Sequence, residues 1–259
     1  MAKKKEMAKV LSQQCLQTGI YDMWIETSLA DEAKAGQFIC VYPKNASILL
    51  PRPISICEVR EDRQALRIVY RVAGQGTAEF STYQEGESIA VMGTLGNGFP
   101  VEKVTDEKTN VFLMGGGIGI PPILQLAKSL NCDKKIIVGY RDASLFLKED
   151  LEKYGEVIIA TEDGSVGTKG NVMDAIREKG LKADMIYACG PMPMLRAIKQ
   201  YAEKEDIPAY ISLEERMACG VGACLGCVCK TKDVDAHSHV HNARICTDGP
   251  VFEAKEVEI

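Results

Sequence analysis

Apolar and polar residues alternate in short runs through the N-terminal part of the chain. Turn-forming pairs such as Ala35-Gly36, Glu61-Asp62 and Glu85-Gly86 separate these runs. The pattern predicts strands over residues 20–27, 37–42, 54–59, 66–72 and 88–92. Because no long amphipathic helix occurs between them, we expect a small antiparallel barrel or sandwich.

The pattern changes after Phe99-Pro100, where short buried runs begin to alternate with longer periodic segments. Predicted strands cover residues 110–114, 135–140, 157–161, 185–189 and 209–213. Predicted helices cover residues 120–130, 145–154, 171–179 and 192–204. Strict alternation of strand and helix predicts a parallel sheet with crossover helices, a Rossmann-like architecture that binds nucleotides.

The remaining segment, residues 214–259, is rich in glycine and cysteine and has no clear periodicity. It therefore needs a metal, a cross-link or a neighbouring domain in order to fold. We expect a multidomain protein of the β plus α/β class. Its predicted domains are a β domain over 1–102, an α/β domain over 103–213 and a small C-terminal domain over 214–259.

Composition and charge narrow the class of protein. The 259 residues carry a net charge of −5, so we expect no nucleic-acid partner. The N-terminus lacks the apolar region of a signal peptide, and no apolar run is long enough to span a membrane. We expect a cytoplasmic protein without a membrane partner, whose ten cysteines are reduced.

Four of the cysteines have a spacing that indicates an iron–sulfur site. Cys219-x4-Cys224-x2-Cys227, followed later by Cys246, is the spacing of plant-type [2Fe–2S] proteins. Glycines among the first three cysteines permit the tight loop that wraps a cluster. The alternative is a zinc site, but zinc sites more often pair two C-x2-C units.

Other potential metal ligands lie close by. We expect Cys229 to be a structural thiol, because its exchange with Cys227 would break the spacing. His237, His239 and His241 precede the fourth cysteine, and we expect them in a solvated loop. The residues contain no Cys-x-His pair of the Rieske type, which leaves adventitious metal binding as the alternative role.

Three further motifs indicate nucleotide chemistry. The run from Met114 to Pro122, MGGGIGIPP, follows a predicted strand and opens a predicted helix, so its backbone can approach a pyrophosphate. The run Tyr187-Ala-Cys-Gly-Pro ends another predicted strand, where open α/β sheets bind ligands. The run Arg52-Pro-Ile-Ser begins a strand of the β domain. Each motif also has a purely structural alternative. The glycine run could be a packing turn, Cys189 could be a buried structural cysteine, and Arg52 could form a surface ion pair.

Four segments resemble, in order, the ferredoxin–NADP reductase superfamily: RPIS, Gly93-x2-Gly96-x-Gly98, GGGIGIPP and ACGPMPM. That superfamily joins an FAD-binding antiparallel β-barrel to an NAD(P)-binding α/β domain. Two more segments, SLEERMACGVGACLGCVCKT and ICTDGPVF, are similar to the electron transfer subunits of B-type, NAD-dependent dihydroorotate dehydrogenases. The similarity covers essentially the whole chain, although the span from Cys227 to Cys246 is longer than is usual in that family.

The resemblance implies a role for each motif residue. Arg52 would lie at the FAD pyrophosphate and Ser55 near the isoalloxazine. The implied FAD-binding residues are Arg52, Pro53, Ile54, Ser55, Val69, Tyr70, Arg71, Gly76 and Thr77. The NAD pyrophosphate would border Gly117, Gly119 and Pro122, and the nicotinamide would lie near Cys189 and Gly190. Ser55 and Cys189 are thus the candidate catalytic residues, and the [2Fe–2S] ligands would be Cys219, Cys224, Cys227 and Cys246.

The resemblance also implies a reaction and a partner. An FMN-containing catalytic subunit would oxidise dihydroorotate, in a heterotetramer of two copies of each subunit. Electrons would pass through the cluster and FAD of this chain to NAD+, in the synthesis of UMP. A flavin must stand between the other two carriers, because NAD+ accepts two electrons together and the cluster carries one at a time.

Two other functions stay open. A related subunit could exchange electrons between NAD(P)H and ferredoxin, but such subunits commonly carry Asp where Cys219 stands here. The chain could also be a non-catalytic module with a structural zinc ion. Arg141 and Asp142 stand side by side, so the residues themselves favour neither NAD nor NADP.

Overall fold

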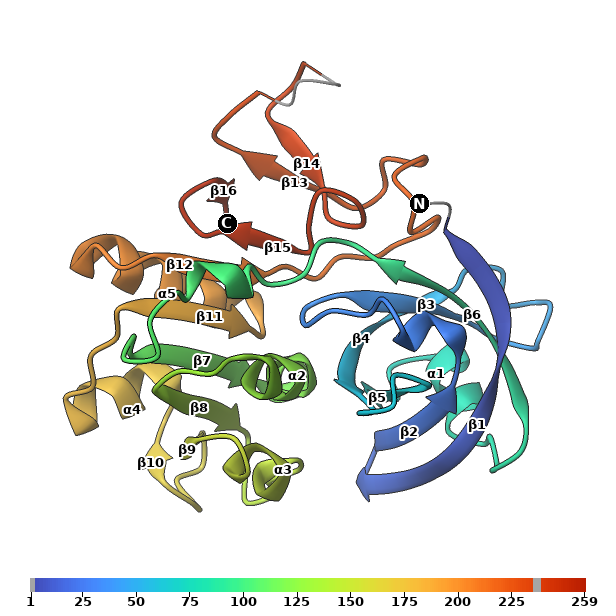
Figure 1. Cartoon of the computed structure of the whole chain (residues 1–259), viewed down its shortest axis with the longest axis horizontal. Helices are drawn as coiled ribbons and strands as arrows, with labels where there is room; N and C mark the ends of the chain where they lie inside the picture. The colour runs from blue at the N-terminus through green and yellow to red at the C-terminus, as the bar shows by residue number, and fades with distance from the viewer. Residues whose placement is uncertain (1–2, 235–238) are drawn as a thin grey trace.

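The N-terminal part of the protein is a closed antiparallel barrel, drawn in blue to teal in the computed structural model (Figure 1). The model describes residues 3–234 and 239–259. The barrel strands follow the order β1-β2-β5-β4-β3-β6. Their bounds are β1 Lys4–Gln17, β2 Ile20–Glu26, β3 Phe38–Tyr42, β4 Arg52–Val59, β5 Ala65–Arg71 and β6 Ser88–Leu95. The fold confirms the predicted barrel.

Two elements of the barrel were not predicted. Strand β1 has a mostly polar sequence, and Ala8 and Val10 are its buried residues, so its apolar face is too short to give a clear alternation. The short helix α1 (Gln75–Phe80) has Gly74 at its N-cap and includes Gly76 in its first turn. Two 3-10 turns, η1 (Ser28–Ala30) and η2 (Val101–Lys103), flank the strands.

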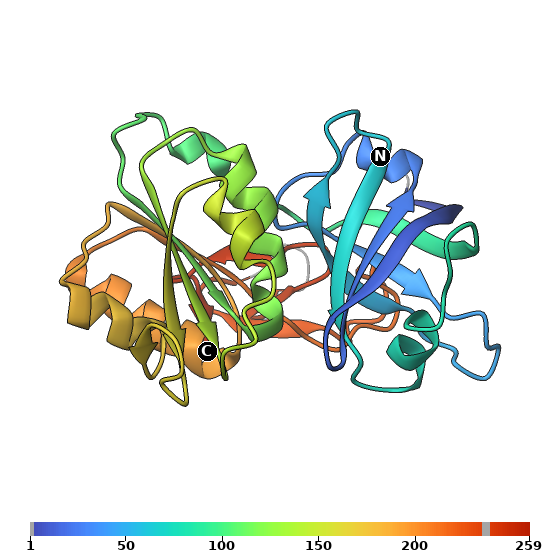
Figure 2. The ribbon, with the colours of Figure 1, turned by 90° about the horizontal axis from the view of Figure 1, so that it is seen from below.

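The middle part is a seven-stranded sheet of order β10-β9-β8-β7-β11-β12-β15. Its strands are β7 Val111–Gly116, β8 Lys134–Tyr140, β9 Glu156–Thr161, β10 Thr168–Lys169, β11 Met185–Cys189, β12 Ala209–Ser212 and β15 Val251–Glu253. Its helical segments are η3 Gly117–Gly119, α2 Pro121–Ser129, α3 Lys148–Glu152, α4 Val172–Lys179 and α5 Met192–Glu205. Helices α2 and α3 face the barrel, whereas α4 and α5 cover the opposite face (Figure 2). The predicted parallel α/β architecture is confirmed, although the predicted helix over 145–154 is too long.

The C-terminal segment lies across the other two parts, as the red ribbon shows (Figure 1). It forms a three-stranded sheet of order β14-β13-β16, with bounds β13 Val228–Thr231, β14 Asn242–Arg244 and β16 Val257–Glu258. Strand β15 joins the edge of the large sheet, where it pairs antiparallel with β12. The sequence predicted that this segment needs a neighbour, but it did not predict the added strand.

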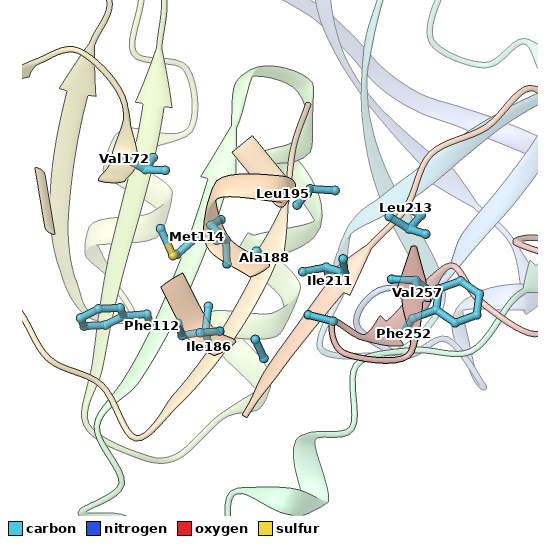
Figure 3. Close-up of a cluster of buried hydrophobic side chains, with 14 of the residues drawn as sticks. Phe112, Met114, Val172, Ile186, Ala188, Leu195, Ile211, Leu213, Phe252 and Val257 are labelled. Carbon is cyan, nitrogen blue, oxygen red and sulfur yellow. The ribbon is translucent and has the colours of Figure 1, made fainter. Parts of the chain in front are cut away.

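One hydrophobic cluster crosses all three parts of the molecule. Phe38 and Leu95 contribute from the barrel, and Ile211 contributes from the sheet. Phe252 and Val257 of the C-terminal segment pack beside Ile211 and Leu213 (Figure 3). The C-terminal segment is therefore held by a core that it shares with both neighbours.

A buried ionic network also joins the barrel to the α/β part. Arg67 of β5 forms ion pairs with Asp22 of β2 at 2.9 Å, Glu58 of β4 at 3.3 Å and Asp150 of α3 at 2.9 Å. Lys128 of α2 pairs with the same Glu58 at 3.0 Å. Because the Arg67 side chain is only 9% exposed, these contacts are shielded from water.

Replacing Arg67 with methionine should strongly destabilise the fold. Arg67→Met leaves the buried Asp22 carboxylate without its cation, so we expect the free energy of unfolding to fall by about 3–5 kcal/mol. Urea denaturation measures the change. The control is Arg60→Met, which breaks an exposed pair with Asp62 and should leave the free energy of unfolding nearly unchanged. Equal losses in the two variants would contradict the prediction.

Candidate functional site

Strand β4 begins with the Arg52-Pro-Ile-Ser run and lies between β3 and β5 of the barrel. Pro53 pairs with Cys40 of β3, and Ser55 pairs with Phe38. The guanidinium of Arg52 lies against Gly76, since a Cβ on Gly76 would stand 2.8 Å from its Nε. The structure thus brings together the Arg52-Pro-Ile-Ser run and the Gly76-Thr77 pair, which are both among the predicted FAD-binding residues. A cation beside an open backbone fits a pyrophosphate.

The other predicted flavin residues differ in their surroundings. Tyr70 of β5 is buried inside the barrel, where its hydroxyl donates to Gln13 Oε1 at 2.8 Å. Arg71, the next residue, is exposed. Thr77 Oγ1 accepts hydrogen bonds from the amides of Ala73 and Gly74 and shapes the turn before α1. A ligand bound beside β5 and α1 would therefore contact Arg71 and the turn before α1. The Tyr70 ring packs in the core of the barrel instead.

The glycine-rich run forms the turn between β7 and α2. Gly117 has a φ of +52° and an open surrounding, so a ligand can approach its backbone. Pro121 and Pro122 occupy the first turn of α2, where a missing amide hydrogen costs nothing. This turn lies at the carboxyl end of β7, where the strand order reverses toward β11. Such switch points are where open α/β sheets bind nucleotides.

Cys189 and Gly190 lie directly beside this turn. A Cβ on Gly119 would stand 2.4 Å from the carbonyl oxygen of Cys189, so the two backbones touch. Cys189 also pairs with Gly115 of β7 and Ser212 of β12. Burial raises the pKa of the Cys189 thiol to about 12, although a hydrogen bond with Ser212 partly offsets it. The thiol is therefore neutral at physiological pH.

The residues after β8, which bear on the choice of nucleotide, are exposed. Asp142 Oδ1 accepts from the Ser144 amide at 2.8 Å, and hydrogen bonds from Ser144 lower the pKa of Asp142. Arg141 is exposed beside it, so the structure keeps both a cation and an anion at this edge.

The four spaced cysteines lie close enough to affect one another's pKa. Cys224 contributes to the pKa of Cys219, and Cys227 and Cys219 both contribute to that of Cys246. In the part of the chain that the structure describes, no three Cys, His, Asp or Glu side chains gather closely enough to hold one metal ion. A [2Fe–2S] cluster is held by two thiolates on each of two irons, whereas a structural zinc ion takes four ligands around one centre.

The environments of these thiols differ. Burial tends to raise the pKa of Cys219, but hydrogen bonds from backbone amides, led by that of Val221, lower it to about 7. Burial raises the pKa of Cys246 to about 12, and the Cys227 thiol adds to this rise. Amides directed at Cys219 Sγ stabilise negative charge there, as a cluster loop requires.

A hairpin explains how Cys246 reaches Cys227 across the long span. Strands β13 and β14 pair Val228 with Arg244, and the Ile245 amide then donates to the Cys227 carbonyl at 2.8 Å.

The other candidate ligands that the structure describes are Cys229, His239 and His241. Cys229 of β13 packs against the shared core, and burial raises its pKa to about 11. His239 is exposed, and His241 Nδ1 lies 2.9 Å from the carbonyl oxygen of Lys232. His237 lies outside the described residues.

Sequence reasoning did not anticipate the role of Cys40. Its buried thiol lies under the cysteine loop, since a Cβ on Gly220 would stand 2.9 Å from Cys40 Sγ. Burial raises the pKa of Cys40 to about 12, and the nearby Cys219 adds to the rise. Because Cys40 pairs with Pro53, one strand separates the cysteine loop from the Arg52-Pro-Ile-Ser run. No local pattern marks this contact between distant segments.

Known proteins match the chain over nearly its full length. The electron transfer subunit of dihydroorotate dehydrogenase B (NAD(+)) from Lysinibacillus sphaericus is 40% identical over 255 residues, which covers 96% of each chain. The subunit of the same name from Bacillus velezensis is 41% identical over 264 residues, covering 99% of this chain and all of that protein. The family described as the iron–sulfur cluster binding domain of dihydroorotate dehydrogenase B matches residues 214–258.

Solved structures agree with the fold. An NADH-dependent reduced ferredoxin-NADP oxidoreductase, studied for flavin-based electron bifurcation, matches with a TM-score of 0.84 and 26% identity, over 97% of this chain and 89% of that one. A ferredoxin NADP+ reductase from Neisseria gonorrhoeae matches with a TM-score of 0.66 and 16% identity, over 82% of this chain and 94% of that one. The second likeness concerns the fold alone. In the described residues, no helix is long and apolar enough to cross a membrane.

Adding one methyl group at Gly119 should abolish binding of NADH. In Gly119→Ala the new Cβ collides with the Cys189 backbone, so the turn and the end of β11 must separate. Isothermal titration calorimetry or fluorescence with NADH measures the effect. The control is Gly180→Ala at the end of α4, where the φ of +61° has open space around it and the cost is about 1–2 kcal/mol of backbone strain. Unchanged NADH affinity in a folded Gly119→Ala protein would contradict the prediction.

Proposed function

This chain belongs to the family of dihydroorotate dehydrogenase B (NAD(+)) electron transfer subunits, and we propose that it carries electrons between a separate dihydroorotate-oxidising subunit and NAD+ in UMP biosynthesis. The observation that carries the proposal is the position of β4. On one side Pro53 pairs with Cys40, which lies under the cysteine loop. At the far end, the Val59 amide donates to Gln125 Oε1 of α2 at 2.7 Å, and α2 begins at the glycine turn.

The residues along β4 fit FAD. The Arg52 guanidinium beside Gly76 would bind the pyrophosphate, because a side chain at Gly76 would occupy that space. Ser55 would donate toward the isoalloxazine from the middle of the strand. When bound, FAD can exchange two electrons with a nicotinamide and single electrons with an iron–sulfur cluster. The protein's contribution is to hold that flavin between the two other sites.

The turn from β7 to α2 would bind the NAD pyrophosphate. Gly117 and Gly119 give the ligand access to backbone amides at the start of the helix, where the helix dipole favours negative charge. Gly190, in the turn after β11, leaves room for the Met194 side chain and for close approach of the Gly116 backbone. We place the neutral, buried thiol of Cys189 near the nicotinamide, where it would exclude water without adding charge.

We assign the cluster to Cys219 and Cys224 on one iron and Cys227 and Cys246 on the other. The amides around Cys219 would hydrogen-bond thiolate and sulfide. The C-x4-C-x2-C spacing favours this assignment over structural zinc. Cys219 itself favours it over a ferredoxin-type partner, since related ferredoxin-linked subunits commonly carry Asp there.

The exposed rim of the cysteine loop is the surface we assign to the catalytic subunit. Cys224 is exposed, and the nearby residues Val221, Leu225 and Val228 of the same segment have exposed fractions of 40% or more. An apolar patch of this kind favours contact with another protein. We propose that the partner contains FMN and that two copies of each chain form a heterotetramer. Ten free cysteines support a reducing compartment, so we place the complex in the cytoplasm.

Removing one proposed ligand should remove the cluster and leave FAD bound. Cys224→Ala takes a thiolate from an exposed position, so the fold should be unaffected. Iron analysis and the visible spectrum measure the two cofactors separately. The control is Cys229→Ala, which lies in the same segment but packs against the core and should keep its iron. Full iron content in Cys224→Ala, or zinc instead of iron in the unmodified chain, would overturn the assignment.

The isolated chain should oxidise NADH with artificial acceptors but should not oxidise dihydroorotate. A tagged chain purified from its own cells should bring down an FMN-containing subunit that supplies the missing activity. Dihydroorotate oxidation by the rigorously isolated chain would show that the substrate site lies here. Recovery of ferredoxin as the stoichiometric partner would favour the ferredoxin-type function.

A further inference from the structure

Asn97 is a polar residue of the Gly93-x2-Gly96-x-Gly98 run that neither proposed nucleotide site uses. Asn97 follows strand β6 of the barrel and faces the C-terminal segment. Its backbone amide donates to the Gly249 carbonyl at 2.6 Å. Its side-chain Nδ2 donates to the carbonyls of Thr247 at 3.2 Å and Asp248 at 2.9 Å. One residue thus binds three consecutive carbonyls, and these directly follow Cys246.

The glycine before Asn97 makes this approach possible. Gly96 has a φ of +72°, and a Cβ there would stand 2.5 Å from Cδ of Pro250 and 2.8 Å from the Gly249 carbonyl oxygen. Any side chain would therefore push the two segments apart. Asn97 also forms a parallel bridge with Pro250, so the end of β6 and the end of the cysteine turn lie backbone to backbone.

The opposite side of the turn contacts the cysteine loop. A Cβ on Gly222 would stand 2.9 Å from Cγ2 of Thr247. Within the turn, Arg244 Nε pairs with Asp248 Oδ2 at 3.0 Å, and the Arg244 amide donates to the same oxygen at 2.7 Å. The turn that carries Cys246 is thus rigid and is held between the loop and the barrel.

We propose that Asn97 is a positioning residue that fixes the Cys246 turn to the flavin barrel and so sets where the cluster lies relative to β4. The inference rests on the proposed function, because it takes Cys246 as a cluster ligand. Asn97 acts through the three carbonyls and touches no reacting atom. Supporting contacts beyond the ligands commonly control metal sites by about 10–100-fold in affinity or activity.

The test compares Asn97→Ala and Asn97→Asp in the full chain loaded with FAD and iron–sulfur cluster. Alanine removes both side-chain donors, whereas aspartate keeps the shape but directs oxygen at two carbonyl oxygens. We expect iron and FAD to stay bound, the EPR spectrum of the reduced cluster to change, and hydrogen exchange over residues 243–253 to increase. Reduction of the cluster by NADH should slow by about 10-fold. The control is Asn131→Ala, which removes a similar donor to Glu107 on the exposed surface.

The outcomes separate the two proposals. Unchanged EPR, exchange and reduction rate in Asn97→Ala would overturn the positioning role while leaving the cluster assignment intact. Wild-type behaviour of Asn97→Asp alone would also overturn it, because it would show that shape suffices. Absence of an iron–sulfur cluster from the unmodified chain would overturn the proposed function and this inference together.

Discussion

The structure depends on the inability of the cysteine segment to bury a core of its own. Its apolar residues, among them Ile245, Phe252 and Val257, complete a hydrophobic cluster that also includes Phe38 of the barrel and Ile211 of the sheet. Burial of this apolar surface is what holds a short, glycine-rich segment in one conformation. Because the same cluster belongs to all three parts, the cysteine loop has a defined place relative to both nucleotide regions.

Because of that shared core, strand β4 lies between the cysteine loop and the α/β part of the protein. The strand has the cysteine loop beyond β3 on one side and helix α2 packed against it on the other. The Arg67 network adds an electrostatic contact between the barrel and Asp150 of helix α3. On the proposed assignment, a flavin held along β4 would lie between a site for two-electron chemistry and a site for one-electron chemistry. This placement, more than any single side chain, accounts for conversion between the two.

Much of the fold could be predicted because its signals are local. The alternation of apolar and polar residues predicted most barrel strands. The glycine-rich run predicted the start of α2, and the cysteine spacing indicated the cluster-binding segment. Strand β1 was missed because its polar sequence buries little beyond Ala8 and Val10. Helix α3 is shorter than predicted because it begins only after Leu147, whose φ is +63°. The contacts of Cys40 and Asn97 join segments far apart in the chain, and local periodicity carries no information about such pairs.

The measurement that most directly tests the account is reduction of the cluster by NADH with and without FAD. The chain would be prepared with its iron–sulfur cluster, stripped of flavin, mixed with NADH under anaerobic conditions, and monitored by EPR. We predict no reduced-cluster signal until FAD is restored, because only a flavin along β4 connects the two sites. Reduction of the cluster at the same rate without FAD would contradict the account.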